Sequence, residues 1–444
     1  MTEKDLLITP IYLLLIITLA YFGRPWFTDK ATRPYFLPAL LVKLAGAIAL
    51  GFVYQFYYGG GDTFSYHTHG SVPIWNAFMD HPTTGLRMIF GANDYSGGVW
   101  DYASKIWYYR DDASFFIVRL ASFFDIFTLG TYSSTALLFA VLSFSGVWAL
   151  FKVFYEKYPE YVKYLAISIL FIPTVFFWGS GILKDSVTLG MLGWIVFSFH
   201  KILLSDKNKF RYVFIIIPAV VAIFIIKKYV LLSLFPAIIL WVYANYIAKV
   251  KSAVIKLAIA PVFIMVALGL GYYAVLKVGE DDPRYNLEKL AKTARTTAYD
   301  IRYGWGKDAG SGYSLGELDG TFGSMVGLMP QAVNVSLFRP YLWEANNPFM
   351  FLSAFESLAF LILTVWIVVN FIRKGSWRVL FNPDVVFTLI FSISFAFAVG
   401  VSTYNFGTLS RYKIPMMPFY AVSLVILYHQ SKRDKKFEEL KVLE

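Results

Sequence analysis

The chain has 444 residues, of which 57% are hydrophobic and 16% are charged, and its formal net charge is +11. A soluble domain cannot bury that much apolar side chain, so the composition excludes a soluble globular protein and indicates a polytopic membrane protein. We attribute the positive charge to the positive-inside rule and to anionic lipid rather than to nucleic acid, and the lack of cysteine excludes disulfides and thiolate metal sites.

Apolar runs long enough to cross a bilayer recur along the chain. The first follows the segment MTEKD, which carries no net positive charge, so we expect a retained span rather than a cleaved signal peptide. The sequence predicts an all-α fold with about eleven spans, near residues 6–22, 37–57, 131–151, 163–180, 186–204, 211–226, 229–247, 255–277, 348–372, 384–403 and 414–430. They make one transmembrane domain, residues 1–430, followed by a basic tail, residues 431–444.

Lysine and arginine in the short connections predict the orientation. They concentrate in one set of loops, which contains Arg24, Lys152, Lys201 and the tail, and this set is expected to be cytoplasmic. The N-terminus is then outside and the C-terminus is cytoplasmic. Two long segments, residues 58–130 and 278–347, lie outside. Neither a G-x-x-x-x-G-K loop nor a G-x-G-x-x-G fingerprint is present, so any chemistry is expected at the outer face without a nucleotide.

The two outer segments contain patterns of their own. Helical spacing of apolar residues over 284–302 predicts an amphipathic helix at the membrane interface. Residues 114–130 are apolar but short and contain Arg119 and Asp125, which also predicts an interfacial helix. The Gly-rich, aromatic segment 303–320 fits a mobile lid over a site, and it fits a disordered loop tip equally well.

The stretch GGGD, residues 59–62, follows the second predicted span directly. Three glycines allow a sharp bend and a close approach of substrate, and a carboxylate at this boundary suits a general base for a hydroxyl, so Asp62 is the candidate catalytic residue. The alternative is a turn residue or a helix N-cap. Tyr66 is a candidate substrate-binding residue. His67 and His69 with Asp62 would form a metal site, although interfacial histidines usually have no such role.

Cations in the short outer turns form the second candidate group. They are Lys184 in WGSGILKDSVTLG, Lys227 and Lys228 in FIIKKYVLL, and Arg411 and Lys413 in FGTLSRYKIPMMP. A helix N-terminus disfavours a cation by itself, but free N–H groups together with a cation make an anion site, so we expect the phosphate of a lipid there. The alternative is snorkelling to headgroups or pairing with loop carboxylates, and we prefer this alternative for the two lysines at the hairpin tip. Asp185 or Ser186 is expected to cap the helix that follows.

Arg339 and Glu344 flank two aromatic residues in the segment before the ninth span. They would either form an ion pair that fixes the loop or contact a sugar on which Trp343 stacks. The sequence leaves both interpretations open.

Taken together, these features resemble the GT-C class of integral-membrane glycosyltransferases, and most of all the bacterial relatives of protein mannosyltransferases and lipid A aminoarabinose transferases. The resemblance rests on Asp62 in the first large outer segment, the interfacial helices after it, the W-x-S-x-x-x-K-D turn from Trp178 to Asp185, and the stretch RYKIPMMP from Arg411 to Pro418. Two departures are an additional N-terminal helix and a single acid, since many relatives have two adjacent acids.

The resemblance implies an enzyme of the cell envelope, at the outer face of the bacterial inner membrane. Asp62 would be the base, and the outer cations would hold the phosphate of a polyprenyl-phosphate sugar donor. The acceptor would be a glycan, a lipid or a protein, and no cofactor is implied, with a divalent metal left open. A surface-polysaccharide polymerase or ligase, a lipid or solute transporter, and an assembly subunit without chemistry remain alternatives.

Overall fold

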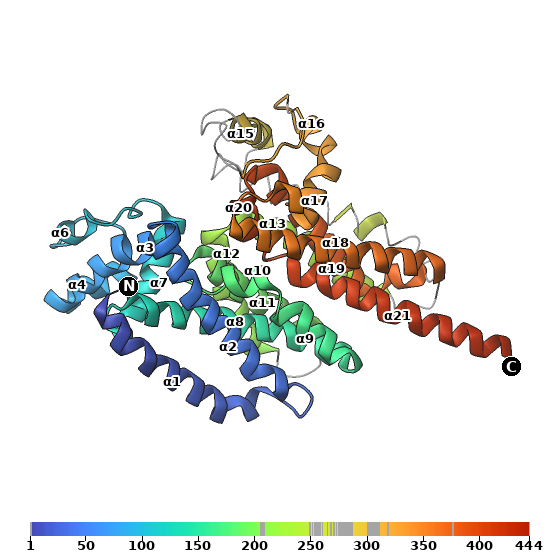
Figure 1. The fold of residues 1–444 in the computed structure, drawn as a ribbon, viewed down its shortest axis with the longest axis horizontal. Coiled ribbons are helices and arrows are strands. Elements are labelled where there is room, and N and C mark those ends of the chain that lie inside the picture. Colours follow the sequence, from blue (N-terminus) through green and yellow to red (C-terminus); the bar gives the residue numbers. More distant parts are fainter. Residues whose placement is uncertain are drawn as a thin grey trace. The chain divides into compact units, whose positions relative to one another are not determined.

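The computed structural model describes residues 2–204, 209–247, 287–299, 311–317, 319–374 and 377–443, with isolated positions between 250 and 273. These residues form two compact units, Met1–Lys227 and Lys228–Glu444, which we describe separately (Figure 1). The described residues are helical or lie in connections, and the β-structure among them is one isolated bridge between Gly312 and Asn405.

Seven helices in the described part of the chain are long and apolar enough to cross a membrane. They are α1 (Glu3–Phe27), α2 (Arg33–Phe52, extended by a π-helical turn to Tyr57), α8 (Tyr132–Lys157), α11 (Lys184–Leu204), α13 (Lys228–Ile247), α18 (Pro348–Lys374) and α19 (Pro383–Thr403). An all-α membrane protein is therefore confirmed, whereas the predicted count of eleven spans is not.

The other four predicted spans have different outcomes. Residues 211–226 form α12 (Phe210–Ile226), an apolar helix of 17 residues that is shorter than a typical span. Residues 414–430 fall largely within α21 (Met417–Leu443), which continues through most of the predicted tail. The predicted span 255–277 lies outside the described residues except for isolated positions.

The fourth predicted span, residues 163–180, is interrupted. It consists of α9 (Val162–Leu170) and α10 (Pro173–Trp178), and a turn over 179–183 leads from α10 to α11. Pro173 explains the break, because proline has no N–H to donate and its ring forces the preceding residue away from the helical region. Ile172 is accordingly extended, with φ −69° and ψ 123°.

In the first unit, α8 lies at the centre and packs against α1, α2, α9 and α11. The α8–α11 contact is backbone to backbone at Gly146, Gly190 and Gly193. A Cβ atom on Gly146 would lie 1.7 Å from the carbonyl oxygen of Gly190, and one on Gly193 would lie 1.9 Å from that of Gly146. Glycine at these positions lets two spanning helices approach closely, which is how membrane helices commonly gain packing energy.

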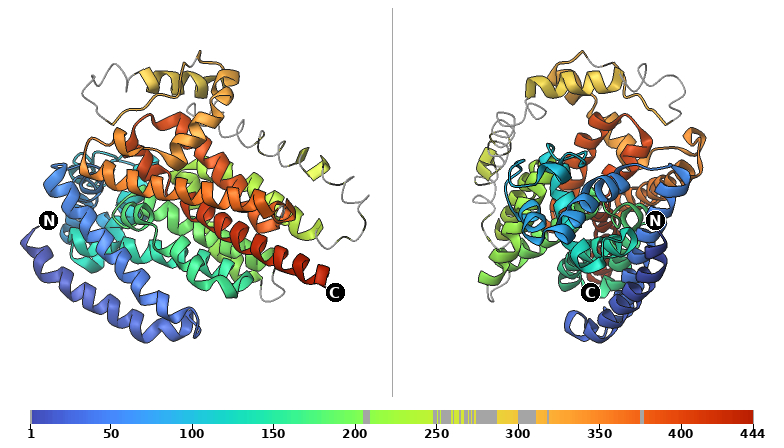
Figure 2. Two further views of the ribbon diagram at one scale, coloured as in Figure 1. Left: turned by 45° about the vertical axis from the view of Figure 1, so that its right-hand side comes forward. Right: turned by 90° about the vertical axis from the view of Figure 1, so that its left-hand side faces the viewer.

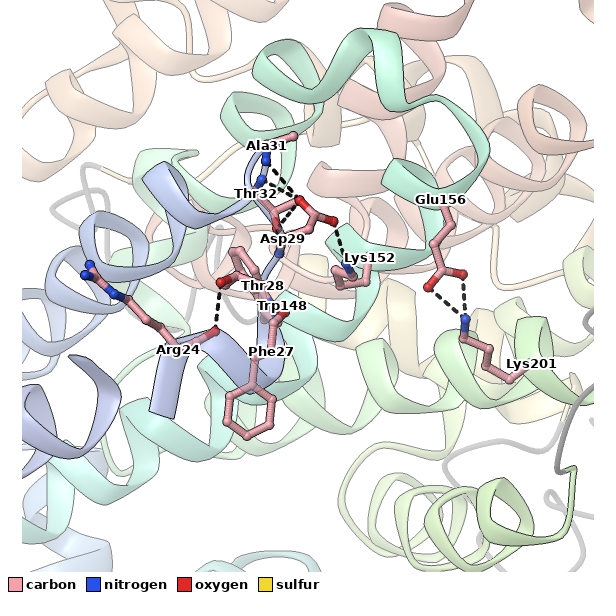
Figure 3. A network of polar contacts seen from close by, with 10 residues as sticks. All are labelled: Arg24, Phe27, Thr28, Asp29, Ala31, Thr32, Trp148, Lys152, Glu156 and Lys201. Carbon is pink, nitrogen blue, oxygen red and sulfur yellow. Dashed lines mark hydrogen bonds and ion pairs between the residues drawn. The ribbon is translucent and has the colours of Figure 1, made fainter. Parts of the chain in front are cut away.

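Charged pairs join the helices at one end of this bundle, which we name the Asp29 end (Figure 3). Asp29, in the turn between α1 and α2, accepts hydrogen bonds from the backbone and hydroxyl of Thr32 and lies 3.5 Å from the Lys152 ammonium of α8. Partial burial opposes its charge, but these bonds outweigh burial and hold the pKa of Asp29 below its ordinary value. Lys201 of α11 pairs with Glu156 of α8 at 2.6 Å.

The opposite end of the bundle, which we name the Asp62 end, has short helices between α2 and α8. They are α3 (Asp62–Tyr66), α4 (Val72–Asp80), α5 (Pro82–Phe90), α6 (Trp100–Ala103) and α7 (Asp112–Thr128). The helix predicted over 114–130 is thus confirmed as α7. Its face carrying Ile117, Val118 and Ala121 is fully buried, and it packs against α4, α5, α8 and α12.

The second unit contains α13, α18, α19 and α21 with shorter helices α15 (Leu287–Tyr299), α16 (Phe322–Gly327), α17 (Met329–Phe338) and α20 (Phe406–Tyr412). The amphipathic helix predicted over 284–302 is confirmed over 287–299 as α15, which contacts α16 and α19 on the outside of this unit (Figure 2), while its place at the membrane interface stays a prediction. Of the segment expected to be a lid, residues 303–310 and 318 lie outside the described residues. In the described part of this segment, Tyr313 is held in place because its backbone N–H donates a hydrogen bond to the Tyr404 carbonyl at 3.0 Å.

Candidate active site

Three consecutive glycines shape the backbone before Asp62. Gly59, Gly60 and Gly61 have φ values of +68°, +134° and +125°, in the region that side chains disfavour. A Cβ atom on Gly61 would lie 2.8 Å from the ring of Tyr54. The stretch is framed by two π-helical turns, Val53–Tyr57 and His67–Ser71, a feature that is frequent at functional sites. The glycines are therefore required by the backbone path that brings the chain to Asp62.

Asp62 is the half-buried first residue of α3. The next residue, Thr63, is fully buried, and its hydroxyl is 2.8 Å from the hydroxyl of Tyr132 at the start of α8. The rings of Phe64 and Tyr132 stack with centroids 4.3 Å apart. These contacts fix the short helix to a spanning helix and thereby set the place of the Asp62 carboxylate.

Lys184 begins α11, as the sequence predicts, and its ammonium lies 3.4 Å from a carboxylate oxygen of Asp111. The side chains are 19% and 45% exposed, so the pair is partly open to solvent. The charges of Asp111, Lys227 and Asp62 all act on the Lys184 ammonium. The acid in contact with Lys184 is thus Asp111, which the sequence reasoning missed, and Asp62 acts on the same ammonium through its charge.

The connection that ends in Asp111 is fastened to the region of Asp62. The Trp107 N–H donates to the His69 carbonyl at 3.1 Å, and the two rings stack in parallel with centroids 3.9 Å apart. Tyr66 is only 3% exposed, and its ring lies 5.2 Å from that of Tyr108. Its contact with a substrate stays a prediction. A sequence signal for Asp111 existed, since a pair of acids at 111–112 precedes an apolar helix, as an N-cap does.

Of the two outcomes that our preferred alternative offered for Lys227, the structure shows pairing with a carboxylate rather than snorkelling to headgroups. Lys227 is buried and forms an ion pair with Asp185, which is also buried. Asp185 was expected to cap α11, but the helix begins one residue earlier, so this carboxylate lies inside the first turn. The two residues are far apart in sequence, and each charge compensates the other, which is what burial of a charge requires.

The two histidines after Asp62 have separate surroundings. His67 is buried, with its Nε2 atom 3.7 Å from a buried oxygen of Asp125, and burial lowers the pKa of His67 and raises the pKa of Asp125. His69 stacks on Trp107. Among the described residues no three or more histidine, aspartate or glutamate side chains are grouped so that they could hold a metal ion, so the structure lends the metal alternative no support.

In the second unit the predicted cations do not begin the last span. Arg411 lies in the last turn of α20, where a cation complements the helix dipole, and α21 begins only at Met417. The expectation that Arg411 lies at the start of the last span and forms an anion site there is therefore wrong, because Arg411 lies at the end of a different helix. Lys413 is fully buried and donates to the Ser357 hydroxyl at 3.2 Å. Burial lowers the pKa of Lys413, and the nearby charge of Glu356 opposes that shift.

Arg339 and Glu344 form the ion pair that one of the two interpretations predicted. The Nε atom of Arg339 is 3.1 and 3.0 Å from the two carboxylate oxygens, and one of these oxygens also accepts from the Tyr341 N–H at 2.8 Å. Trp343 is 80% exposed, with its ring 4.9 Å from that of Tyr341. A sugar contact by this segment stays a prediction.

Sequence reasoning missed Lys43, which lies within α2 and is 2% exposed. Its ammonium donates to the Gly179 carbonyl at 2.6 Å, the Ser143 hydroxyl at 3.1 Å and the Val175 carbonyl at 3.2 Å. A signal existed here too, because an ionisable residue inside an apolar run of spanning length usually marks a functional site.

The predicted site residues divide between the two units. The first unit holds Asp62, Tyr66, Lys184 and Lys227, and the second holds Lys228, Arg339, Glu344, Arg411 and Lys413. Lys228 is the half-buried first residue of α13. One anion site shared by all of these cations stays a prediction, and the group that the structure assembles is Asp62, Asp111 and Lys184. No known protein family, curated protein or solved structure matches this chain.

Proposed function

We propose that the protein is a membrane glycosyltransferase that moves a sugar from a polyprenyl-phosphate donor to an acceptor in the cell envelope. The observation that carries the proposal is the group at the Asp62 end of the first unit. A carboxylate held on a glycine-framed turn lies within electrostatic reach of an ammonium at the start of a spanning helix. A base beside a cation at a membrane boundary suits a reaction between a hydroxyl and a lipid-linked phosphate.

The reaction is a direct displacement. Asp62 takes the proton of the acceptor hydroxyl while that oxygen attacks the anomeric carbon of the sugar. The bond between this carbon and the phosphate oxygen breaks, and the polyprenyl phosphate leaves with the electron pair. Lys184 offsets the negative charge that develops on the departing phosphate, and Asp111 keeps the ammonium charged and in place.

Lys227 supplies a further positive charge near Lys184, although its own partner is Asp185. Arg339 with Glu344 remains a candidate for contact with a sugar. The acceptor is a glycan, a lipid or a protein, and use of an oligosaccharide on lipid diphosphate in place of a small lipid-monophosphate sugar would make the enzyme a polymerase or ligase.

The site is proposed to face outward across the inner membrane of a bacterium, with the N-terminus outside and the C-terminus cytoplasmic. Charge supports this orientation, because Arg24, Lys152 and Lys201 of the first unit lie toward its Asp29 end, away from Asp62. The acids and lysines of the site occupy the other end.

A transporter is the second candidate, and one observation favours it. The helix broken at Pro173 and the lysine within α2 resemble the discontinuous helices and buried charges that transporters place near the bilayer midplane. A transporter would move its ligand between compartments without breaking a bond.

The two candidates differ in a measurable product. Protein reconstituted in nanodiscs is offered radiolabelled polyprenyl-phosphate sugars with envelope extracts as acceptor, and we expect the label to leave the donor. Lys184→Ala should raise the KM for the donor and leave the KM for the acceptor unchanged, whereas Lys152→Ala, at the Asp29 end, serves as the control. Flux into proteoliposomes without loss of label from the donor would favour the transporter.

A further inference from the structure

We propose that Lys43 is a positioning residue, which holds the turn over 179–183 and so fixes Lys184 at the site. The functional importance of this inference rests on the proposed function. The contacts that support it are independent of that function. They join α2 and α8 to the end of α10 and to the turn that follows it, all within the first unit.

Lys43 lies deep in its span. It is ten residues after Arg33, which corresponds to about 15 Å along a helix, or about half the thickness of the hydrocarbon core. An ammonium at this depth is costly, and such residues persist where they meet polar partners inside the protein. Lys43 has three N–H donors and three oxygen acceptors within 3.2 Å, so its hydrogen bonding is complete.

Two of these acceptors end a helix. Val175 lies in the last turn of α10, and Gly179 follows that helix directly. Backbone carbonyls at a helix C-terminus carry partial negative charge, which favours an ammonium, and the Val175 carbonyl also accepts the Gly179 N–H at 3.2 Å. The Lys43 charge is therefore offset by the broken end of α10 rather than by a carboxylate.

The same face of α2 packs against α10 at one further point and against the turn at another. A Cβ atom on Gly46 would lie 2.5 Å from the carbonyl oxygen of Phe176, and one on Gly181 would lie 2.5 Å from the side chain of Leu50. Residues 43, 46 and 50 share one face of a helix. The end of α10 and the turn are therefore packed closely against α2 and hydrogen-bonded to the Lys43 ammonium.

Lys184 follows this turn immediately. A chain path fixed by Lys43 at Gly179 leaves four residues before the helix that presents Lys184 to Asp111. Loss of the ammonium would leave two buried carbonyls without it and would let the turn move, and the first residue to be displaced would be Lys184. The sequence shows that a lysine lies within the second span, but only the structure shows that Lys43 contacts the end of α10 and the turn after it.

Cross-linking tests the inference without any assumption about activity. The chain has no cysteine, so Asp111→Cys with Lys184→Cys gives a clean pair for a short bifunctional thiol reagent. We expect Lys43→Met to reduce the cross-linking yield at least fivefold and the matched Lys152→Met to leave it unchanged. Ser143→Ala removes one of the three acceptors, and we expect a smaller loss in the same direction from this milder change.

An unchanged yield in a folded Lys43→Met or Ser143→Ala protein overturns the inference, and folding is checked by size-exclusion chromatography in detergent. If the wild type consumes lipid-linked sugar, Lys43→Met in the cysteine-free chain should also raise the donor KM more than it lowers kcat. If the wild type consumes none, the glycosyltransferase proposal fails, while the cross-linking yield still decides the role of Lys43.

Discussion

Replacing Gly61 with alanine tests whether the glycines before Asp62 are imposed by the backbone. Gly61 has φ +125° and ψ −166°, a combination that is open almost only to glycine. A Cβ atom there would also lie 2.8 and 2.9 Å from two ring atoms of Tyr54. That ring is buried and lies edge-on to Trp178, so it cannot simply swing away.

The expected cost follows from these two effects. A residue with a side chain in this region of φ and ψ is strained by about 1–3 kcal/mol, and crowding in a packed site adds about 1–3 kcal/mol. We expect Gly61→Ala to lose about 3 kcal/mol of unfolding free energy, which for a unit of this size is about 6–12 °C in Tm. Gly59, with φ +68° and no heavy atom near its Cβ position, is the control. Gly59→Ala should lose only about 1 kcal/mol, or about 2–4 °C.

The assay is thermal unfolding of the purified protein in detergent, followed by intrinsic tryptophan fluorescence. Gly59→Asn adds a second control, because asparagine tolerates the left-handed conformation better than alanine does. Equal Tm losses for Gly61→Ala and Gly59→Ala would refute the steric part of the reasoning. A wild-type Tm for both variants would refute the account of the backbone as well.

Three other predictions concern packing, pH and an ion pair. Gly146→Ala places a methyl group 1.7 Å from a carbonyl oxygen of the facing helix, so we expect a larger loss of Tm than for Gly23→Ala, whose Cβ would meet no heavy atom closer than 3.9 Å. Burial lowers the pKa of His67, so the folded state disfavours its proton; stability should fall as pH drops below about 6.5, and His67→Gln should flatten that fall in Tm-against-pH curves. A double-mutant cycle on Arg339→Gln and Glu344→Gln should give a coupling of about 1–2 kcal/mol in chemical denaturation, and additive losses would show that the pair contributes nothing.

The spanning helices could be predicted because they depend on local composition. Length and hydropathy give α18 and α19 within two residues of their observed ends and α2 and α8 within about six, and helical spacing gives α15. The break before Pro173 was visible in the sequence, but an apolar run of spanning length outweighed it in the prediction. A proline breaks the helix at one position, and hydropathy averaged over a window does not detect such a break.

The site was predictable only in part. The run of three glycines before Asp62 is unusual in composition and could be recognised from the sequence. Lys184 could be recognised because it lies where a predicted span begins. The partners Asp111 and Lys227 come from distant segments, and nothing in the local pattern pairs Lys227 with Asp185. Ion pairs of this kind depend on how the helices pack, and packing in turn depends on contacts such as the glycine interface between α8 and α11.

The central claim is that Asp62 acts as the base in sugar transfer from a lipid phosphate, and Asp62→Asn tests it most directly. Asparagine keeps the size of the side chain and its place at the start of α3 but cannot accept the proton. With purified protein and radiolabelled polyprenyl-phosphate sugar, the account predicts that kcat falls by about 10²–10⁴-fold while the donor KM stays close to that of the wild type. Turnover by Asp62→Asn at the wild-type rate would contradict it.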